Sequence, residues 1–517
     1  MSNAALAAVT LEESLSWGVR DFVVCTGARN APLVLPLLEA PSAVRVWRHF
    51  DERSAAFFAL GLARRERRPV AVVTTSGTAV AELLPAVIEA HYAGLPLLLI
   101  TADRPKRFRG TGAPQAILQA HLFGEHSEGC LDVEAAEDFP RGFPWSRLRP
   151  IQVNPGFEEP GAEPPAVVDW VGAMHRVTAP MRPCLIGDET LLDRFLADFA
   201  DGVVILGEID ATDRPAVEGF LKTLGAPVWT EATSGLRESA ALAHLLLPGG
   251  DGAFREWRPA KVLRIGGVPS LRYWRDLESQ PRVPVLSVTR TGFSGLARAS
   301  ETLPWVDFAA VAVAGRSQRP DMPVDERRER LPAFPRSEPA WMGALSEVIP
   351  SEARIFLGNS LPIREWNLAA TRAVPHPAVH ANRGANGIDG EVSTFLGLSE
   401  GAAEAWGIFG DLTALYDLNA PWVLDQLSAG RRRLVVINNG GGRIFSRLAS
   451  LSGIDESRKR ITENRHAIGF EPWARLWGLG YRRLTDPAGL AEVAAEDEAA
   501  AIIEIVPDAA ETEAFWG

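Results

Sequence analysis

Short apolar runs alternate with amphipathic segments along much of the 517-residue chain, and this alternation is what most limits the folds it can adopt. In the N-terminal part, the apolar runs that predict buried strands are residues 21–27, 44–50, 69–77 and 95–103. The amphipathic segments that predict helices between them are residues 31–40, 52–66 and 78–93. A chain that alternates strand and helix in this way forms a parallel sheet with helices on its faces.

Two Pro-rich stretches, residues 140–183 and 315–339, interrupt the alternation and are predicted to be linkers. The further predicted strands are residues 202–208, 226–232, 261–267, 283–289, 354–360, 378–384, 405–411, 433–440 and 500–507. A chain of 517 residues is too long for a single core. The sequence therefore predicts three α/β domains, each with a doubly wound parallel sheet, at residues 1–180, 185–335 and 336–517.

The charge and the cysteines exclude several classes of protein. A net charge of −12 argues against a general nucleic-acid or anionic-membrane binder. The three cysteines, Cys25, Cys130 and Cys184, lack CxxC spacing, which is typical of a reducing compartment and argues against a zinc site. The N-terminus lacks a basic start followed by an apolar core, and no apolar run is long enough to span a membrane. The protein is therefore predicted to be cytoplasmic.

Polar residues follow two neighbouring strands of the predicted C-terminal domain. Asp411 ends the run "GIFGD", and Asn439 follows the run "LVVIN" 28 residues later. A carboxylate, an amide oxygen and a glycine carbonyl form a site for a hard cation such as Mg²⁺, and the glycines after Asn439 allow a diphosphate to approach backbone N–H groups. Asp411 alone is explained as a helix N-cap, and Asn439 with its neighbours alone is explained as a plain turn. The two together, each at a strand end, predict a metal–diphosphate site.

This pair of motifs resembles the metal–diphosphate motif of thiamine-diphosphate enzymes. Further stretches resemble the 2-succinyl-5-enolpyruvyl-6-hydroxy-3-cyclohexene-1-carboxylate synthases, and they follow the order of that family from residue 26 to residue 445. They are "TGARNAPL", "FDERSAAFFALGLA", "TTSGTAVAELLPAVIEA", "LLLITADRP", "GAPQAI", "LGNSLPIREWN", "ANRGANGIDGEVSTFLGL", "GDLTALYDLNA" and "INNGGGRIF". Of these, "NRGANGIDG" and "GDLTALYDLNA" are much more specific than the general motif.

The resemblance implies a fold of the thiamine-diphosphate decarboxylase type, with a pyrimidine-binding domain at 1–180, a middle domain at 185–335 and a diphosphate-binding domain at 336–517. It implies a transferase that uses thiamine diphosphate with Mg²⁺ or Mn²⁺. The implied reaction decarboxylates 2-oxoglutarate and adds the succinyl-semialdehyde carbanion to isochorismate in a 1,4 sense, in menaquinone or phylloquinone biosynthesis. The implied assembly is a homodimer or a dimer of dimers with active sites between subunits, without a nucleic-acid partner.

Glu52 follows Asp51 at the start of a predicted helix, and the residues alone favour a surface acid near the helix N-terminus. The resemblance implies a catalytic role instead. In thiamine-diphosphate enzymes a glutamate at this position hydrogen-bonds N1′ of the cofactor and acts across a subunit interface. Asp51 is then the expected N-cap.

The resemblance assigns the other site residues by their motifs. The expected cofactor contacts are Thr75, Ser76, Ile388, Asp411, Asn439 and Gly441, the last three through the metal. The expected substrate contacts are Arg29, Arg104, Gln115, Ser360, Arg364, Arg383, Ile444, Phe445 and Leu448, with Arg272 as a further candidate. Four arginines suit two dicarboxylate substrates, because guanidinium groups bind carboxylates through paired hydrogen bonds.

The chain departs from the family pattern at three positions, one of them Leu412, where the motif reads Gly-Asp-Leu rather than Gly-Asp-Gly. Ala28 replaces a serine often seen before the motif arginine, and Pro114 replaces an asparagine before Gln115. Two alternatives stay open, another thiamine-diphosphate-dependent 2-oxoacid decarboxylase or carboligase and a non-catalytic subunit of the same fold. The sequence has no GxxxxGK[ST] phosphate loop and no convincing GxGxxG in the middle domain, so a nucleotide-binding module, FAD and NAD are not predicted.

Overall fold

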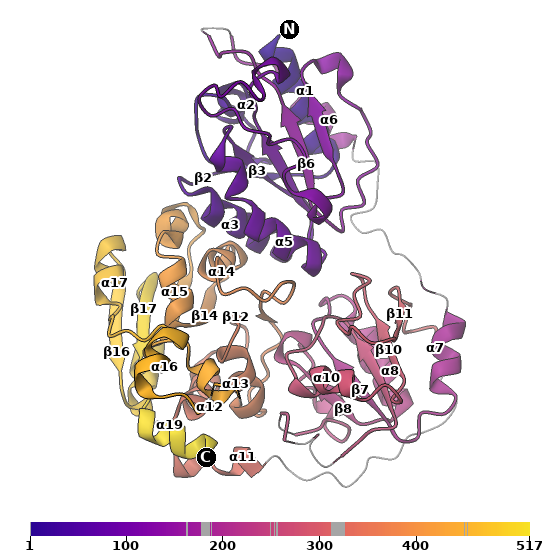
Figure 1. The fold of residues 1–517 in the computed structure, drawn as a ribbon, viewed down its shortest axis with the longest axis vertical. Helices are drawn as coiled ribbons and strands as arrows, with labels where there is room; N and C mark the ends of the chain where they lie inside the picture. Colours follow the sequence, from indigo (N-terminus) through magenta and orange to yellow (C-terminus); the bar gives the residue numbers. More distant parts are fainter. Residues whose placement is uncertain are drawn as a thin grey trace. The chain divides into compact units, whose positions relative to one another are not determined.

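The computed structural model describes residues 2–161, 164–176, 187, 189–248, 250–252, 254, 257–311, 326–448, 450–451 and 453–517, so Cys184 lies outside it. The chain forms two compact units. Unit 1 comprises residues 1–183, 384–400 and 416–428, and unit 2 comprises residues 184–383, 401–415 and 429–517. Within the described ranges the strands form three parallel sheets, one in each of the three predicted domains (Figure 1). The predicted fold class is confirmed, and the domain limits stay a prediction.

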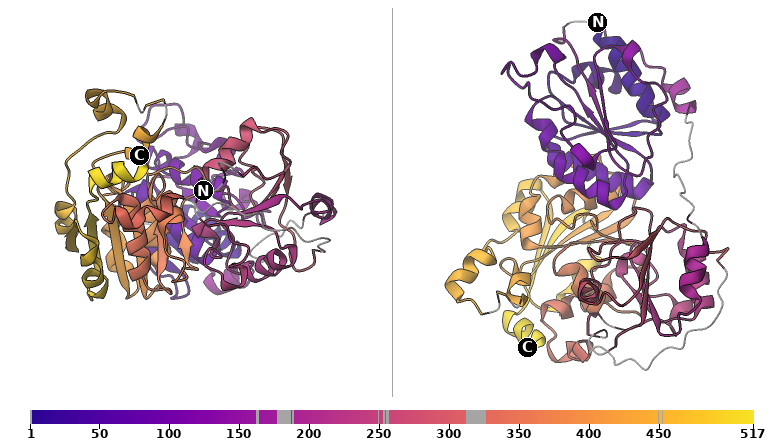
Figure 2. Two further views of the ribbon diagram at one scale, coloured as in Figure 1. Left: turned by 90° about the horizontal axis from the view of Figure 1, so that it is seen from below. Right: turned by 45° about the vertical axis from the view of Figure 1, so that its right-hand side comes forward.

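Unit 1 is built around a six-stranded sheet in the order β2-β1-β3-β4-β6-β5. Its strands are β1 (Asp21–Val24), β2 (Arg45–Arg48), β3 (Val70–Thr74), β4 (Leu97–Thr101), β5 (Cys130–Val133) and β6 (Ile151–Pro155). Its helices are α1 (Asn3–Ser16), α2 (Ala31–Leu37), α3 (Glu52–Glu66), α4 (Thr78–Ala81), α5 (Leu84–Ala93), α6 (Trp170–His175) and α14 (Glu391–Ser399). Helices lie on both faces of this sheet (Figure 2), which explains why β3 and β4 are buried along their whole length and continuously apolar.

Unit 2 contains a six-stranded sheet in the order β13-β12-β14-β15-β17-β16, which repeats the order of the first sheet. Its strands are β12 (Arg354–Leu357), β13 (Val379–His380), β14 (Glu404–Gly410), β15 (Arg431–Ile437), β16 (Gly480–Leu484) and β17 (Ala500–Ile505). The accompanying helices are α12 (Glu338–Val348), α13 (Pro362–Ala369), α15 (Asp411–Tyr416), α16 (Glu456–Thr462), α17 (Glu471–Trp477), α18 (Leu490–Ala495) and α19 (Ala509–Trp516). In both sheets the winding reverses between the first and third strands, and α/β proteins bind ligands at the carboxyl edge of such a switch point.

The middle sheet of unit 2 has five strands in the order β11-β10-β9-β7-β8. They are β7 (Gly202–Leu206), β8 (Val228–Thr230), β9 (Lys261–Ile265), β10 (Val285–Val288) and β11 (Glu301–Leu303). The helices of this part are α7 (Glu189–Leu196), α8 (Arg214–Leu224), α10 (Arg272–Asp276) and α11 (Glu326–Glu329). Among the helices that the structure describes, none combines the length and the apolar character needed to cross a membrane.

The predicted linker at residues 140–183 is wrong in part, because β6 lies within it. This strand is buried and pairs with β4 on one side and β5 on the other. Its polar residues Gln152 and Asn154 are satisfied by side-chain hydrogen bonds, which is why an apolar pattern failed to reveal it. The second half of the predicted linker lies partly outside the described residues.

Helices α3 and α14 of unit 1 pack closely through facing glycines. A Cβ at Gly61 would lie 2.0 Å from the carbonyl oxygen of Thr394, and a Cβ at Gly397 would lie 2.1 Å from that of Phe58. Only glycine allows two helix backbones to approach to this distance. The contact fixes residues 384–400 to the first sheet although they follow β13 in the chain.

Gly61→Ala is expected to destabilise the protein by roughly 1–3 kcal/mol, the usual cost of overpacking, because the new methyl group overlaps the Thr394 carbonyl. Gly219→Ala in α8 is the matched control, since a Cβ there meets nothing within 4 Å. Alanine at that position lowers the entropy of the unfolded chain and leaves stability equal or higher. Urea unfolding midpoints measure both, and a Gly61→Ala midpoint equal to wild type would contradict the close helix contact.

Candidate active site

Two neighbouring strands of the third sheet end at the same edge and bring Asp411 together with the turn that follows β15. β14 and β15 pair in parallel over their full length, so Asp411 and Asn439 both lie just beyond the sheet. Asp411 Oδ2 accepts hydrogen bonds from the N–H groups of Gly440 at 2.8 Å and Gly441 at 2.9 Å. The φ angles of these glycines, 78° and 132°, are what allow the turn to present consecutive N–H groups.

The polar groups at this edge fit a metal ion with oxygen ligands. Asn439 Nδ2 donates to both carboxylate oxygens of Glu338, at 3.1 and 3.0 Å, so the other end of the amide points away from Glu338. That atom, Oδ1, is buried and has no hydrogen-bond partner. Burial raises the pKa of Asp411, against the hydrogen bonds that it accepts from the glycine turn. An orphaned amide oxygen and a buried carboxylate, with the nearby Gly441 carbonyl, suit Mg²⁺ or Mn²⁺.

Three further predicted residues lie at the same edge. Ser360 follows β12, Arg364 lies in α13 and Arg383 follows β13. Arg364 donates to the Ser360 carbonyl, and Arg383 Nη1 donates to Asn359 Oδ1 at 2.8 Å. Burial, followed by repulsion from Arg383 and Arg275, lowers the pKa of Arg364 to about 10. Cations that repel one another in a buried position are stabilised by an anionic ligand.

Arg272, the candidate from the middle domain, does not join this cationic group. It is exposed and pairs with Asp276 at 3.0 Å, one turn along α10. Arg275 on the same helix is the residue whose charge acts on Arg364. Sequence analysis missed Arg275, because tertiary packing alone decides which face of α10 points toward α13.

The predicted apolar wall lies on one short helical turn, η9 (Arg443–Arg447), and the residue after it. Ile444 is half-buried, whereas Phe445 and Leu448 are 39% and 40% exposed. Large apolar side chains left exposed beside charged groups are typical of a binding surface. The turn is tied to α13 by an ion pair of Arg447 with Glu365, at 3.1 Å.

In unit 1, two predicted arginines converge on one carboxylate. Arg29 follows β1 and Arg104 follows β4, and their nearest guanidinium nitrogens lie 2.6 and 3.7 Å from Glu159 Oε2. Arg29 is buried and also donates to the Phe157 carbonyl, whereas Glu159 is 74% exposed. The two guanidinium groups therefore form a carboxylate-binding position in which Glu159, a residue that sequence analysis missed, is held only weakly.

Glu52 is the first residue of α3, and Asp51 is its N-cap, as predicted. Asp51 Oδ1 accepts from the Ser54 N–H at 3.1 Å, and Oδ2 accepts from Asn419 at 3.0 Å. Burial raises the pKa of Glu52, and the charges of Asp51 and Glu82 raise it further. A glutamate that holds its proton more tightly than usual is suited to share a proton with a ring nitrogen.

Thr75, Ser76 and Gln115 meet at the same edge of the first sheet. Thr75 and Ser76 follow β3, and a Cβ on the next residue, Gly77, would lie 3.4 Å from Gln115. The buried amide of Gln119 fixes this turn, because it accepts from the Gly77 N–H at 3.0 Å and donates to two carbonyls at the end of β4. The role of Gln119 could not be predicted from the sequence, because it depends on contacts with residues distant in the chain.

Ile388 lies half-buried in the loop before α14, and both ends of this loop are fixed to helices of unit 1. Glu89 of α5 accepts from two consecutive N–H groups, the first that of Gly384, at 2.8 and 2.6 Å. At the other end, Phe57 of α3 packs against Gly390, where a Cβ would lie 1.9 Å from its ring. The backbone that carries Ile388 is therefore held in one position.

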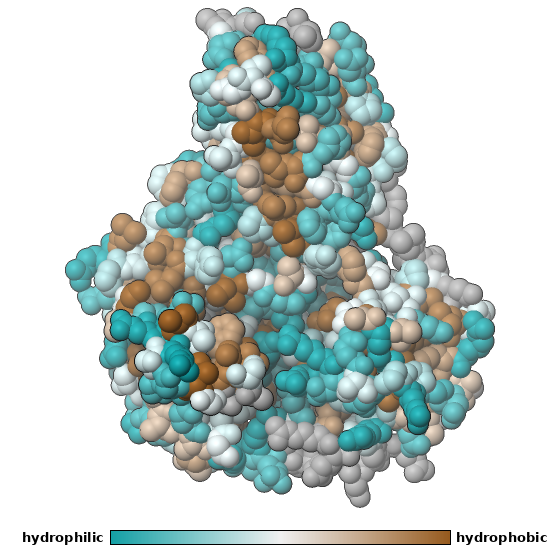
Figure 3. Space-filling model, viewed as in Figure 1, coloured by the Kyte–Doolittle hydropathy of each residue, from teal (hydrophilic) through white to brown (hydrophobic). Residues whose placement is uncertain are grey.

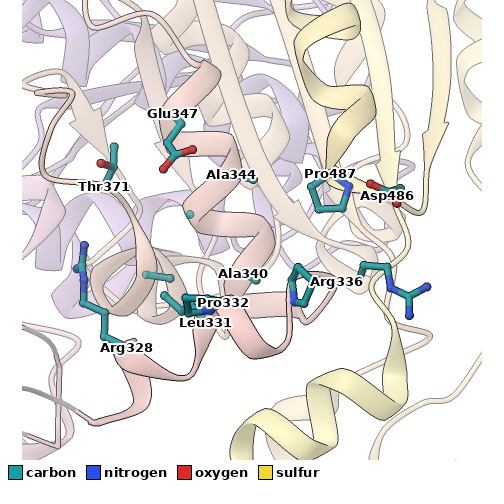
Figure 4. Close-up of a pocket in the computed structure, with 13 residues that line it drawn as sticks. Arg328, Leu331, Pro332, Arg336, Ala340, Ala344, Glu347, Thr371, Asp486 and Pro487 are labelled. Carbon is teal, nitrogen blue, oxygen red and sulfur yellow. The ribbon is translucent and has the colours of Figure 1, made fainter.

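A cavity of about 640 Å³ in unit 2 lies apart from the predicted site (Figure 4). Its charged and polar lining residues are Arg328, Arg336, Glu347, Thr371 and Asp486. None of the predicted site residues lines it.

Comparison with known proteins identifies the family. Residues 4–122 match the thiamine pyrophosphate enzyme, N-terminal TPP binding domain. The chain is 42% identical over 528 residues to a 2-succinyl-5-enolpyruvyl-6-hydroxy-3-cyclohexene-1-carboxylate synthase of Akkermansia muciniphila, with 99% of this chain and 98% of the relative covered. The chain belongs to this synthase family. A synthase of the same name from Bdellovibrio bacteriovorus is 39% identical, with 100% of this chain and 98% of the relative covered.

Membership of the synthase family confirms the resemblance seen in the sequence, and with the domain match it confirms thiamine diphosphate as the cofactor. The fold has an independent counterpart in a solved structure, benzoylformate decarboxylase from Polynucleobacter necessarius. The two chains superpose with a TM-score of 0.71 at 14% identity, covering 97% of this chain and 98% of the decarboxylase. At that identity the likeness concerns the fold alone.

Glu159→Gln is expected to lower the KM of at least one of the carboxylate substrates implied by the resemblance, 2-oxoglutarate and isochorismate. The change removes a competing charge from Arg29 and Arg104, and an exposed ion pair contributes up to ~1 kcal/mol, about fivefold in affinity. Glu158→Gln is the matched control, because the neighbouring carboxylate pairs with Arg107 instead. Steady-state kinetics of both variants decide the point, and unchanged KM values in Glu159→Gln would contradict it.

Proposed function

We propose that this member of the synthase family decarboxylates 2-oxoglutarate and adds the resulting succinyl-semialdehyde unit to isochorismate in a 1,4 sense. The product is 2-succinyl-5-enolpyruvyl-6-hydroxy-3-cyclohexene-1-carboxylate, formed in menaquinone or phylloquinone biosynthesis, and we place the reaction in the cytoplasm. The observation that carries the proposal is similarity to synthases of this name over the whole chain. The groups at the carboxyl edges of the first and third sheets support it.

Asp411, Asn439 and the carbonyl of Gly441 would hold Mg²⁺ or Mn²⁺ against the diphosphate of the cofactor. Asn439 Oδ1 is buried without a hydrogen-bond partner, and a bound cation would satisfy it. This observation supports the assignment. When bound, thiamine diphosphate accepts the electrons that decarboxylation releases, which is the cofactor's own chemistry. The tasks left to this chain are to hold the cofactor, to place one proton and to orient two anions.

Glu52 would place the proton, at N1′ of the cofactor's pyrimidine ring. The raised pKa of its carboxyl group supports this role, since the protonated acid can donate to a ring nitrogen. Ile388 would contact the cofactor from a loop whose two ends are fixed by Glu89 and Phe57. Thr75 and Ser76 would contact it from the turn after β3.

The arginines would bind and orient the carboxylates of the two substrates. Arg29 and Arg104 already converge on one carboxylate, and Arg364 and Arg383 raise the positive charge at the edge of the third sheet. Gln115 and Ser360 would add hydrogen bonds. Ile444, Phe445 and Leu448 would keep water from the reacting carbon, which otherwise takes up a proton in place of the second substrate.

The assembly would be a homodimer or a dimer of dimers, with each active site between subunits and Glu52 supplied across the interface. Unit 1 supports an interface of this kind, because its exposed large apolar side chains include Leu35, Phe50 and Tyr416. Figure 3 shows an apolar patch on the visible face of this unit. Closed symmetric dimers are the commonest solution for covering such surfaces.

The proposed function is tested by isochorismate consumption with purified protein, thiamine diphosphate, Mg²⁺ and 2-oxoglutarate, each omitted in turn. We expect the isochorismate absorbance to fall only in the complete mixture. Release of CO₂ from 2-oxoglutarate without loss of isochorismate would overturn the assigned acceptor and favour another carboligase or decarboxylase. Cofactor binding without any turnover would favour a non-catalytic subunit.

Glu52→Gln is expected to bind thiamine diphosphate nearly as well as wild type and to lose most of its turnover, by about 10²–10⁴-fold, the usual contribution of a positioned proton donor. Glu66→Gln, at the far end of the same helix, is the control and should retain activity. Calorimetric titration of the cofactor and kcat measure the two effects separately. Near-normal kcat in Glu52→Gln would show that another group places the proton.

A further inference from the structure

The proposed metal ligand Asn439 is oriented by a buried acid that the sequence did not single out, Glu338. This glutamate is the first residue of α12, where Ser337 caps the helix and the helix N-terminus favours negative charge. Its own N–H donates to Thr512 Oγ1 at 3.0 Å, which fixes its backbone. Because a carboxylate offers only acceptors, its contact with Asn439 Nδ2 selects the amide orientation that leaves Oδ1 for another partner.

Two more groups connect Glu338 to the apolar wall of the substrate site. The buried carboxyl groups of Glu338 and of Glu365 in α13 lie close enough for each to shift the pKa of the other, and Glu365 Oε1 accepts from Arg447 Nη1 at 3.1 Å. Arg447 belongs to η9 and also stacks on Trp516, with 4.2 Å from the guanidinium carbon to the ring centroid. A continuous path of side chains therefore runs from the metal ligand to η9.

These charged groups are costly to bury, and the cost indicates a role beyond packing. Glu338 and Glu365 are both buried, and burial, followed by the charge of Glu338, raises the pKa of Glu365 well above its usual range. Arg447 offsets the charge of both. Apolar residues of similar volume are often as stable as a buried ionic group or more so, so stability alone does not explain the two acids.

We propose that Glu338 is a positioning residue for the metal site and that Glu365 and Arg447 couple this site to η9. The inference rests on the proposed function, since it takes Asn439 as a metal ligand. Glu338 holds the amide oxygen in the direction of the cation before the cation arrives. Through the side-chain path, a bound ion and an ordered η9 stabilise each other.

The test is binding of Mn²⁺ and thiamine diphosphate to Glu338→Gln without substrates, with free Mn²⁺ followed by electron paramagnetic resonance and the cofactor by calorimetry. Glutamine can turn either its NH₂ group or its oxygen toward Asn439, so it no longer fixes the amide. We expect a 10- to 100-fold loss of Mn²⁺ affinity, roughly the usual effect of changing a residue that orients a ligand. Saturating Mn²⁺ should restore cofactor affinity, which a merely structural defect would not allow.

Glu404→Gln is the matched control. Glu404 is buried like Glu338 but lies at the amino end of β14, where it binds Arg431 and Trp406, so its substitution should leave Mn²⁺ affinity unchanged. Equal Mn²⁺ affinity in Glu338→Gln and wild type overturns the inference. Wild-type protein that binds neither Mn²⁺ nor the cofactor overturns the proposed function instead.

Arg447→Met tests the coupling to η9 and carries the test alone if Glu338→Gln fails to fold. It removes the ion pair with Glu365 while keeping an apolar chain of similar length. We expect a severalfold weaker Mn²⁺ affinity together with a higher KM for the substrates, and partial rescue of both by Arg447→Lys. Unchanged Mn²⁺ affinity and KM in Arg447→Met overturn the coupling.

Discussion

The parallel pairing of β14 with β15 is the constraint on which the site of unit 2 depends. Because the two strands run in the same direction and pair to their last residues, they deliver Asp411 and the turn at Asn439 to one edge of the sheet. The strands β12 and β13 end at the same edge and add Ser360 and Arg383. Residues separated by some 80 positions in the chain thus become one chemical environment.

Charged side chains are buried near the carboxyl ends of these strands. Arg364 is partly desolvated and repelled by other arginines, while the buried Glu365 pairs with Arg447 and is raised in pKa by burial and by the charge of Glu338. Such arrangements lower stability unless a ligand or a fixed geometry compensates them, and perturbed pKa values therefore concentrate at functional sites. The first sheet also has an acid with a perturbed pKa beyond a strand end, since burial raises the pKa of Glu52 after β2.

Most strands and the strand-end residues could be predicted because both depend on local sequence, but β5, β6, β11 and β16 were missed. Continuous apolar runs mark buried strands, and the motif residues Asp411 and Asn439 follow them directly. The helix predicted at 78–93 is two helices, α4 and α5, and Pro85 lies in the first turn of the second. What failed depended on distant contacts. Strand β6 was missed because it contains buried polar residues, whose side chains form hydrogen bonds with other elements.

The residues that support the site were also beyond local sequence patterns. Glu338 lies at the end of a Pro-rich stretch interpreted as a linker, although Pro339 only starts α12. Glu159 lies in a stretch rich in proline and glycine. It contacts Arg29 and Arg104, and Arg29 is more than a hundred residues away in the sequence. Patterns of residue type therefore located the groups proposed to act on ligands, and the structure was needed to find those that hold them in place.

The most direct test of the account is complementation between two inactive variants, because the proposed site takes Glu52 from one subunit and Asp411 with Asn439 from another. Glu52→Gln and Asp411→Asn are each expressed alone and are also co-expressed. The rate of isochorismate consumption is then compared among the three preparations. Random pairing makes half of the dimers mixed, each with one intact site, so the account predicts recovery of about one quarter of wild-type activity. Activity no higher than the sum of the separate variants would contradict it.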